Sequence, residues 1–197
     1  MEPYASPVQS RDLESIPKSR YVLFLGLGIF GTAADLLSKQ FVFSWRGLPG
    51  ELPPKWLIEP YVGIETAVNQ GALFGLGQGK GWLFAILSVV ALVGICIWLF
   101  VYKACLSRWI TVTMGLVVGG ILGNLYDRLA IPALPVPYRG GVRDWILFRY
   151  QDYVWPNFNI ADSLLVAGAI MLAIHTLFMQ PSPKEASASG DSSALKP

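Results

Sequence analysis

The chain has 197 residues, of which 53% are hydrophobic and only 14% charged, and its mean hydropathy is +0.48. Soluble domains usually carry about 25% charged residues, so this composition indicates an integral membrane protein. The net charge of +2 comes with no nucleic-acid footprint, and no nucleic-acid partner is expected.

The N-terminal segment, 1–19, is polar and contains three prolines. It lacks the apolar core of a cleavable signal peptide, so we expect the first apolar segment to remain as an uncleaved anchor. At the other end, residues 181–197 are rich in Ser, Ala and Pro, which predicts a disordered tail.

Four apolar segments approach the length of about 20 residues that a helix needs to cross a bilayer. The last three each contain a long stretch without a charged residue. The first reaches spanning length only if its helix continues through Asp35 towards Lys39. The predicted spans are 20–40, 81–103, 108–127 and 161–180.

Two long loops separate these spans. Residues 61–68 alternate in polarity and are partly β-branched, and Asn69-Gln70-Gly71 supplies a turn, so we expect a small sheet on the membrane surface within 41–78. The second loop, 129–157, carries several prolines and a Gly-Gly pair, which favours an irregular flap.

Alternation of four spans brings both long loops to one side of the membrane, together with the acids between Asp35 and Asp162. The Lys and Arg residues in the short flanks favour cytoplasmic termini, although four arginines at or near the second loop oppose this orientation. Polar function is therefore expected on the side of the loops.

Asp162 begins the last span, and an acid at the mouth of a span is a candidate functional residue. A second acid within reach, Asp144, allows a carboxylate pair that activates water. Structural alternatives remain open for both. Asn159 and Asp162 have the spacing of a capping box, and Asp144 has the spacing of a surface ion pair with Arg143.

Other polar residues have structural alternatives as well. Asp35 and Lys39 are four residues apart, which suits a salt bridge within one helix. Asp127 and Arg128 are interpretable as a pair at a helix end. Turn or capping roles suit Asn69 and Asn124, and close helix packing suits the glycines at 115, 119, 120 and 123.

Other chemistries are narrowed by what the chain contains. The single histidine, His175, lies on the opposite side from the acids, and no His-Glu-x-x-His motif is present, so a zincin-type metal site is excluded. Cys96 and Cys105 lie within or beyond the second span, also away from the side of the membrane that carries the acids. Carboxylate chemistry, or passage of ions or protons, remains.

Five sequence blocks resemble those of lipoprotein signal peptidase, the type II signal peptidase family of bacteria. They run in the family's order over 20–180. The blocks are Asp35-Leu36-Leu37-Ser38-Lys39, Asn69-Gln70-Gly71-Ala72-Leu73-Phe74-Gly75, Gly119-Gly120-Ile121-Leu122-Gly123-Asn124-Leu125-Tyr126-Asp127-Arg128-Leu129, Val142-Arg143-Asp144-Trp145-Ile146 and Pro156-Asn157-Phe158-Asn159-Ile160-Ala161-Asp162-Ser163.

The resemblance implies a four-helix membrane aspartic protease with a β-cradle and an extracytoplasmic flap, without metal or cofactor. It implies Asp144 and Asp162 as the catalytic pair. The residues implied to support them or to bind substrate are Asp35, Lys39, Asn69, Gly71, Asn124, Asp127, Arg128 and Asn159.

The implied substrates are prolipoproteins, cleaved before a diacylglyceryl-modified cysteine in the bacterial inner membrane. Membrane lipid is expected as a partner, and globomycin-type compounds as inhibitors. Two features differ from the family pattern: Arg143 stands where an apolar residue is usual, and the Pro-rich stretch 131–141 is longer. The alternative from another class is an ion or proton transporter that uses interfacial aspartates.

Overall fold

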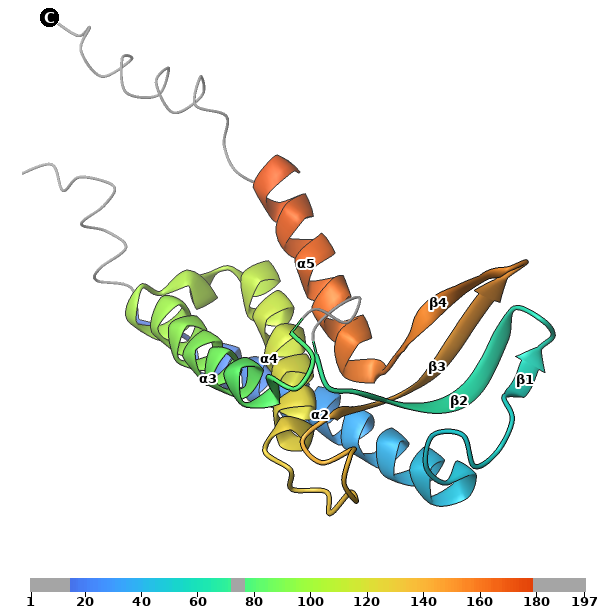
Figure 1. Cartoon of the computed structure of the whole chain (residues 1–197). Helices are drawn as coiled ribbons and strands as arrows, with labels where there is room; N and C mark the ends of the chain where they lie inside the picture. Colours follow the sequence, from blue (N-terminus) through green and yellow to red (C-terminus); the bar gives the residue numbers. More distant parts are fainter. Residues whose placement is uncertain (1–14, 72–76, 179–197) are drawn as a thin grey trace, which may run out of the picture.

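The computed structural model describes residues 15–71 and 77–178. In these ranges four helices are long and apolar enough to cross a membrane, and a four-stranded antiparallel sheet extends from one end of the helix bundle (Figure 1). The predicted fold class is thereby confirmed. The predicted disordered tail, 181–197, and residues 1–14 lie outside the described residues.

Each predicted span corresponds to a helix. The four helices are α2 (Lys18–Arg46), α3 (Gly81–Cys96), α4 (Arg108–Arg128) and α5 (Ile160–Phe178). A π-helical turn, Ile97–Val101, extends α3. A 3₁₀ turn, Ala104–Leu106, then leads to α4, where the Ser107 side chain accepts a hydrogen bond from the Ile110 N–H and caps the helix.

The first helix is longer than predicted, because 41–46 belong to α2 and not to the surface sheet. These residues include no helix breaker. The helix ends where Gly47 adopts a φ of 77°, a conformation that favours glycine, and the Gly47 N–H still bonds to Phe43 O.

Both long loops contribute strands to the sheet. Its strands, in spatial order, are β1 (Lys55–Ile58), β2 (Val62–Asn69), β3 (Val142–Tyr150) and β4 (Tyr153–Phe158). The prediction of an irregular flap over 129–157 is therefore wrong from Val142 onwards. The prolines of 131–141 dominated that expectation, whereas β3 is rich in residues that favour strands and completes the ladder on β2.

Helix α4 lies at the centre of the bundle and packs against α2, α3 and α5 (Figure 1). A Cβ on Gly119 would lie 3.2 Å from the Gly31 Cα, so the two glycines allow α2 and α4 to approach closely. The expected packing role of the α4 glycines is confirmed. Many large apolar side chains on α2, α3 and α5 are exposed, as lipid-facing surfaces require.

The apolar core occupies the end of the bundle away from the sheet. Phe24, Leu99 and Met114 belong to one buried cluster there, and Tyr21 stacks on Phe100 with ring centroids 4.8 Å apart. The buried charged and amide side chains are instead concentrated at the sheet end, where the chain crosses between helices and strands.

Candidate active site

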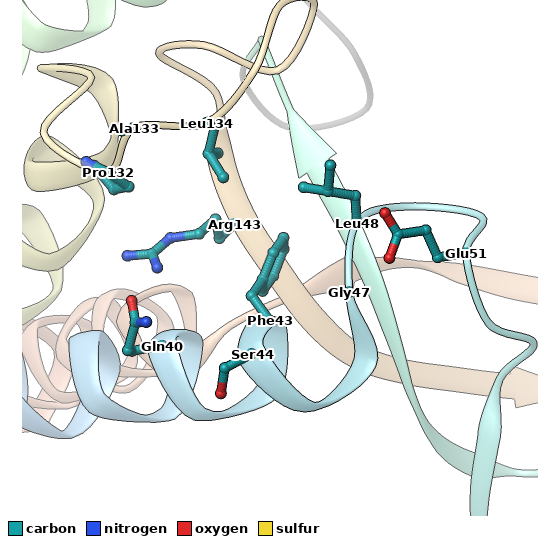
Figure 2. A pocket seen from close by; sticks show the side chains of 10 residues that line it. All are labelled: Gln40, Phe43, Ser44, Gly47, Leu48, Glu51, Pro132, Ala133, Leu134 and Arg143. Carbon is teal, nitrogen blue, oxygen red and sulfur yellow. The ribbon is translucent and has the colours of Figure 1, made fainter.

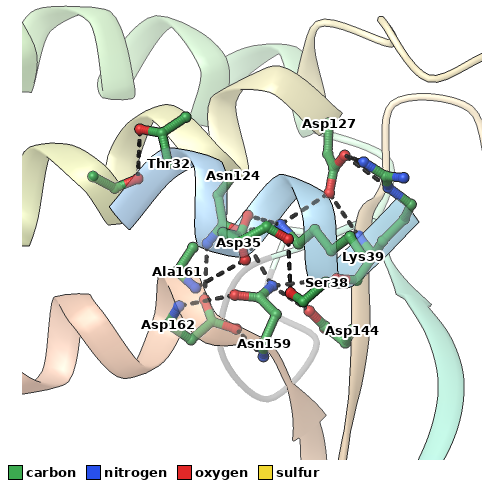
Figure 3. Close-up of polar contacts among 12 residues, drawn as sticks. Thr32, Asp35, Ser38, Lys39, Asn124, Asp127, Asp144, Asn159, Ala161 and Asp162 are labelled. Atoms are coloured by element: carbon green, nitrogen blue, oxygen red, sulfur yellow. Dashed lines mark hydrogen bonds and ion pairs between the residues drawn. The ribbon is translucent and has the colours of Figure 1, made fainter. Parts of the chain in front are cut away.

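Four elements meet where the sheet joins the bundle: the middle of α2, the C-terminal end of α4, strand β3 and the first turn of α5 (Figure 3). Each contributes polar side chains that point towards one another. Seven of these side chains are at most 4% exposed: Asp35, Lys39, Asn124, Asp127, Arg143, Asp144 and Asn159. Buried polar groups of this kind need hydrogen-bond partners, and the site supplies them internally.

Asn159 and Asp162 form the predicted capping box at the start of α5. The Asn159 Oδ1 accepts the Asp162 N–H at 2.8 Å, and the Asp162 Oδ2 accepts the Asn159 N–H at 3.2 Å. The side chain of Asp162 is thereby fixed at a helix N-terminus, where the helix dipole stabilises negative charge. The capping role and a chemical role are compatible, because only Oδ2 of Asp162 takes part in the capping box, whereas Oδ1 faces Asn124.

Two asparagine amides connect Asp162 with Asp144. The Asn124 Nδ2 donates to Asp162 Oδ1 at 2.8 Å, and the Asn159 Nδ2 donates to Asp144 Oδ1 at 2.7 Å. The two amides also meet, because the Asn159 Nδ2 lies 3.1 Å from Asn124 Oδ1. A continuous path of hydrogen bonds therefore joins the two carboxylates through α4 and the start of α5.

A buried cation supports this path from α2. The Lys39 Nζ lies 2.7 Å from Asp35 Oδ2 and 3.1 Å from Asp127 Oδ2, and it donates to Asn124 Oδ1 at 3.0 Å. The predicted salt bridge between Asp35 and Lys39 is confirmed, although it is fully buried. Asp35 also accepts the Ala161 N–H at 2.9 Å, which ties α2 to the first turn of α5.

Close helix contact makes room for this ion pair. A Cβ on Gly123 would lie 2.9 Å from the Asp35 Cγ, so only glycine fits opposite the Asp35 carboxylate. Asp35 pairs with Lys39 of α2 and accepts the Ala161 N–H of α5 while its carboxylate lies against Gly123 of α4, and a larger residue at position 123 would disturb these contacts.

Arg143 bonds to Asp127, so the alternative of a surface ion pair between Arg143 and Asp144 is wrong. Its Nη2 and Nε lie 2.8 and 2.9 Å from Asp127 Oδ1, and its backbone N–H donates to Asp127 Oδ2 at 3.0 Å. Successive side chains of a strand point to opposite faces, so Arg143 is directed away from the carboxylate of its neighbour. Among the described residues, the ion pairs of Asp127 run to Lys39 and Arg143, and not to Arg128.

The environments of the two carboxylates differ. Asp144 is 3% exposed, and burial raises its pKa well above the usual 3.8, with the nearby charge of Asp162 raising the pKa further. Asp162 is half-buried at the helix N-terminus. Two acids in such unequal surroundings favour one shared proton.

The remaining predicted residues lie around this centre. Arg128 interacts electrostatically with Asp162 and Asp144, and its guanidinium lies over the Phe84 ring, 5.5 Å from the centroid. Asn69 Oδ1 accepts the Gly71 N–H at 2.9 Å, which confirms the turn role of this pair at the end of β2. Asn69 is paired in register with Val142, two residues before Asp144.

Two contributors were not assigned a site role from the sequence. One is Arg143, which was noted only as unusual beside Asp144. The other is Asn157, whose Nδ2 donates to Glu65 O at 3.0 Å and links the end of β4 to β2. Asn157 belongs to the sequence block 156–163 that resembles the family. Its contact with Glu65 could not be predicted without the register of β3 and β4 in the sheet. In 15–71 and 77–178, no group of three or more His, Cys, Asp or Glu side chains is arranged to hold a metal ion.

A family model described as signal peptidase (SPase) II matches residues 27–178. The chain belongs to the signal peptidase II family. A protein named lipoprotein signal peptidase from Rhodopirellula baltica is 54% identical over 185 residues, covering 92% of this chain and 82% of the relative. Another so named, from Rhodococcus jostii, is 35% identical and covers 80% of this chain and 73% of its own length.

Solved structures of bacterial membrane enzymes share the fold of this chain. One described as a bacterial membrane enzyme superposes with a TM-score of 0.65 at 26% identity, covering 83% of this chain and 90% of the other. The protein is therefore a bacterial membrane hydrolase of the aspartic peptidase class that removes signal peptides from prolipoproteins. The predicted family and activity are confirmed, and the transporter alternative gains no support.

Proposed function

We propose that Asp144 and Asp162 are the catalytic pair of this peptidase. The observation that carries the proposal is the path of hydrogen bonds from Asp144 through Asn159 and Asn124 to Asp162. It fixes two carboxyl groups of unequal burial relative to each other, which is the arrangement that general acid–base hydrolysis requires.

The resting proton is assigned to Asp144. Burial and the charge of Asp162 both raise the pKa of Asp144, which favours its neutral form. Asp162 accepts one N–H from Asn124 and one from Asn159, and such bonds stabilise a carboxylate. Asp162 then acts as the base and Asp144 as the acid.

The reaction needs no covalent intermediate. Asp162 takes a proton from water while the oxygen attacks the scissile carbonyl, and Asp144 donates its proton to that carbonyl oxygen. Collapse of the tetrahedral diol breaks the C–N bond. The proton held by Asp162 passes to the leaving amine, and Asp144 recovers its proton from the diol, which leaves a signal peptide with a free carboxyl group.

The substrate bond is placed before a diacylglyceryl-modified cysteine. The exposed apolar sides of α2, α3 and α5 would keep the acyl chains in lipid, so that the substrate arrives laterally. Arg128 and the turn at Asn69 and Gly71 border the site and would hold substrate backbone. Globomycin-type inhibitors would occupy this same site.

The site is assigned to the extracytoplasmic side of the inner membrane, with cytoplasmic termini. A cysteine introduced at Asp152, the exposed turn between β3 and β4, tests this in a background free of other cysteines. Labelling by an impermeant thiol reagent in cells with a permeabilised outer membrane is expected. If this cysteine were labelled only after the inner membrane is disrupted, the site would lie on the cytoplasmic side and the proposed orientation would be wrong.

The catalytic pair is tested by Asp144→Asn and Asp162→Asn in purified protein with a synthetic lipidated prolipoprotein. We expect each variant to lose about 10³-fold or more in kcat/KM, because general acid–base roles typically contribute about 10²–10⁴-fold each. Asp152→Asn, which changes an exposed acid of the same sheet, is the matched control and should stay within about twofold. If either site variant processed the substrate at the wild-type rate, the proposal that Asp144 and Asp162 form the catalytic pair would be wrong.

A further inference from the structure

Arg143 is a buried cation that the proposed mechanism does not use. It is 3% exposed and stands directly before Asp144 in β3. Both its side chain and its backbone N–H bind the Asp127 carboxylate, which occupies the last turn of α4. These contacts attach the start of β3 to the end of α4 at the point where Asp144 enters the site.

The charges around Arg143 balance. Asp35 and Asp127 carry two negative charges, and Lys39 and Arg143 carry two positive ones, all at most 3% exposed. Lys39 contacts both acids, so without Arg143 one buried ammonium would serve two carboxylates. An uncompensated buried charge is costly, and its field would reach neighbouring groups.

We propose that Arg143 is a positioning residue for the catalytic pair: it locks β3 to α4 and neutralises Asp127, so that Asp144 stays on the Asn159 amide and Lys39 stays on Asn124. This inference rests on the proposed role of Asp144. It differs from that role because Arg143 acts through Asp127 and does not touch the reacting atoms.

A cavity beside Arg143 provides experimental access to it. Its volume is about 320 Å³, and it lies between the last turns of α2 and residues 132–134 (Figure 2). Gln40 and Ser44 line it from α2, and the Arg143 guanidinium borders it. A small cation that enters this cavity would reach the position of a truncated Arg143 side chain.

The first experiment compares Arg143→Met with Arg149→Met in full-length protein in detergent. Arg149 is the matched control, because it lies in the same strand with its guanidinium over the Trp56 ring, 5.1 Å from the centroid. We expect Arg143→Met to lower kcat by about tenfold to a hundredfold, because small displacements of catalytic groups are costly. Equal kcat values for the two variants would overturn the proposal.

The pH profile separates positioning from general folding. The charged groups that act on Asp144 are Asp162 from α5, Lys39 from α2, and Asp127 from α4, and Arg128 of α4 interacts with it as well. Removing the Arg143 charge leaves Asp127 less compensated, so the limb of the pH profile that Asp144 controls should move to higher pH. Arg143→Met/Asp127→Asn should move it back, and a limb that stays in place in the single variant would contradict the neutralising role.

Chemical rescue with a soluble guanidinium ion tests the same role in a way that does not depend on comparing differently folded variants. Arg143→Ala, assayed with millimolar guanidinium chloride, should regain activity, whereas equal sodium chloride should not restore it. Arg143→Lys keeps the charge, so the limb of its pH profile that Asp144 controls should lie at the wild-type pH while its kcat is reduced. Failure of guanidinium to restore Arg143→Ala would overturn the proposal, whereas activity in Asp144→Asn would instead overturn the catalytic pair.

Discussion

Asn159 donates its side-chain amide to Asp144 Oδ1 at 2.7 Å, and the oxygen of the same amide accepts the Asp162 N–H at 2.8 Å. One fully buried side chain therefore caps the helix that presents Asp162 and orients the carboxyl group of Asp144. The distance between the two acids is controlled by a residue that has no acid–base chemistry of its own.

The two tasks of Asn159 are separable by substitution. Asn159→Ser keeps an oxygen that caps α5, but its shorter side chain lacks the amide N–H that reaches Asp144, so it should retain most stability and lose about tenfold or more in kcat. Asn159→Ala loses both and should cost about a further 1 kcal/mol in unfolding free energy. Thermal unfolding and kcat are measured on both variants, and equal kcat for Asn159→Ser and wild type would contradict the orienting role.

The raised pKa of Asp144 predicts how stability depends on pH. Between 3.8 and the higher pKa of the folded state, the folded protein binds more protons than the unfolded chain, so its stability falls as pH rises. Asp144→Asn removes this dependence. The variant should match the wild type near pH 4 and become relatively more stable towards neutral pH, by up to about 1.4 kcal/mol per pH unit.

This dependence is measured as the difference in unfolding temperature between Asp144→Asn and wild type at a series of pH values. The Asp152→Asn variant serves as the control, because its side chain is exposed. A difference that shrinks as pH rises would mean that Asp144 is ionised in the folded protein, contrary to the assignment of the resting proton.

Lys39 should be the most sensitive charged position for folding. Lys39→Met leaves the buried carboxylates of Asp35 and Asp127 without their shared cation, and breaking a buried ion pair in this way typically costs about 3–5 kcal/mol. Lys80→Met changes an exposed lysine and should leave the unfolding free energy unchanged. Comparable denaturation midpoints for the two variants would show that the Lys39 cluster contributes no net stability.

Gly123 should tolerate no side chain. Gly123→Ala would place a methyl group 2.9 Å from the Asp35 Cγ and should displace the Asp35 carboxylate from Lys39 and Ala161, lowering both stability and activity. Gly26→Ala is the matched control in α2, since nothing lies within 4 Å of its Cβ position. Unfolding temperature and kcat should fall only for Gly123→Ala, and parallel behaviour of the two variants would contradict the packing role.

Much of the fold was predictable from the sequence because membrane spans have a one-dimensional signature. Apolar length located the last three membrane helices, the first required its helix to continue through Asp35 towards Lys39, and the Asn159–Asp162 spacing predicted the capping box. Strands β3 and β4 were missed, because β3 pairs with β2, which is about 80 residues earlier, and β4 in turn pairs with β3, and such pairing leaves no local signal in the sequence.

The residues of the site were easier to predict from the sequence than their hydrogen-bond and ion-pair partners. Spacing within one helix identified the Asp35–Lys39 pair correctly, whereas the neighbours Arg143 and Asp144 suggested a contact that does not form. Adjacent residues of a strand point to opposite sides, and Arg143 therefore meets Asp127 from another element. Such contacts across elements become visible only when the register of β3 is known.

Asp144 and Asp162 are proposed to act as one unit, and this is tested by measuring kcat/KM of Asp144→Asn/Asp162→Asn beside the two single variants. Groups that act as a unit lose about as much when one is removed as when both are. We predict that the double variant stays within about tenfold of the weaker single variant. Two modest single losses that multiply in the double variant would contradict a shared catalytic role.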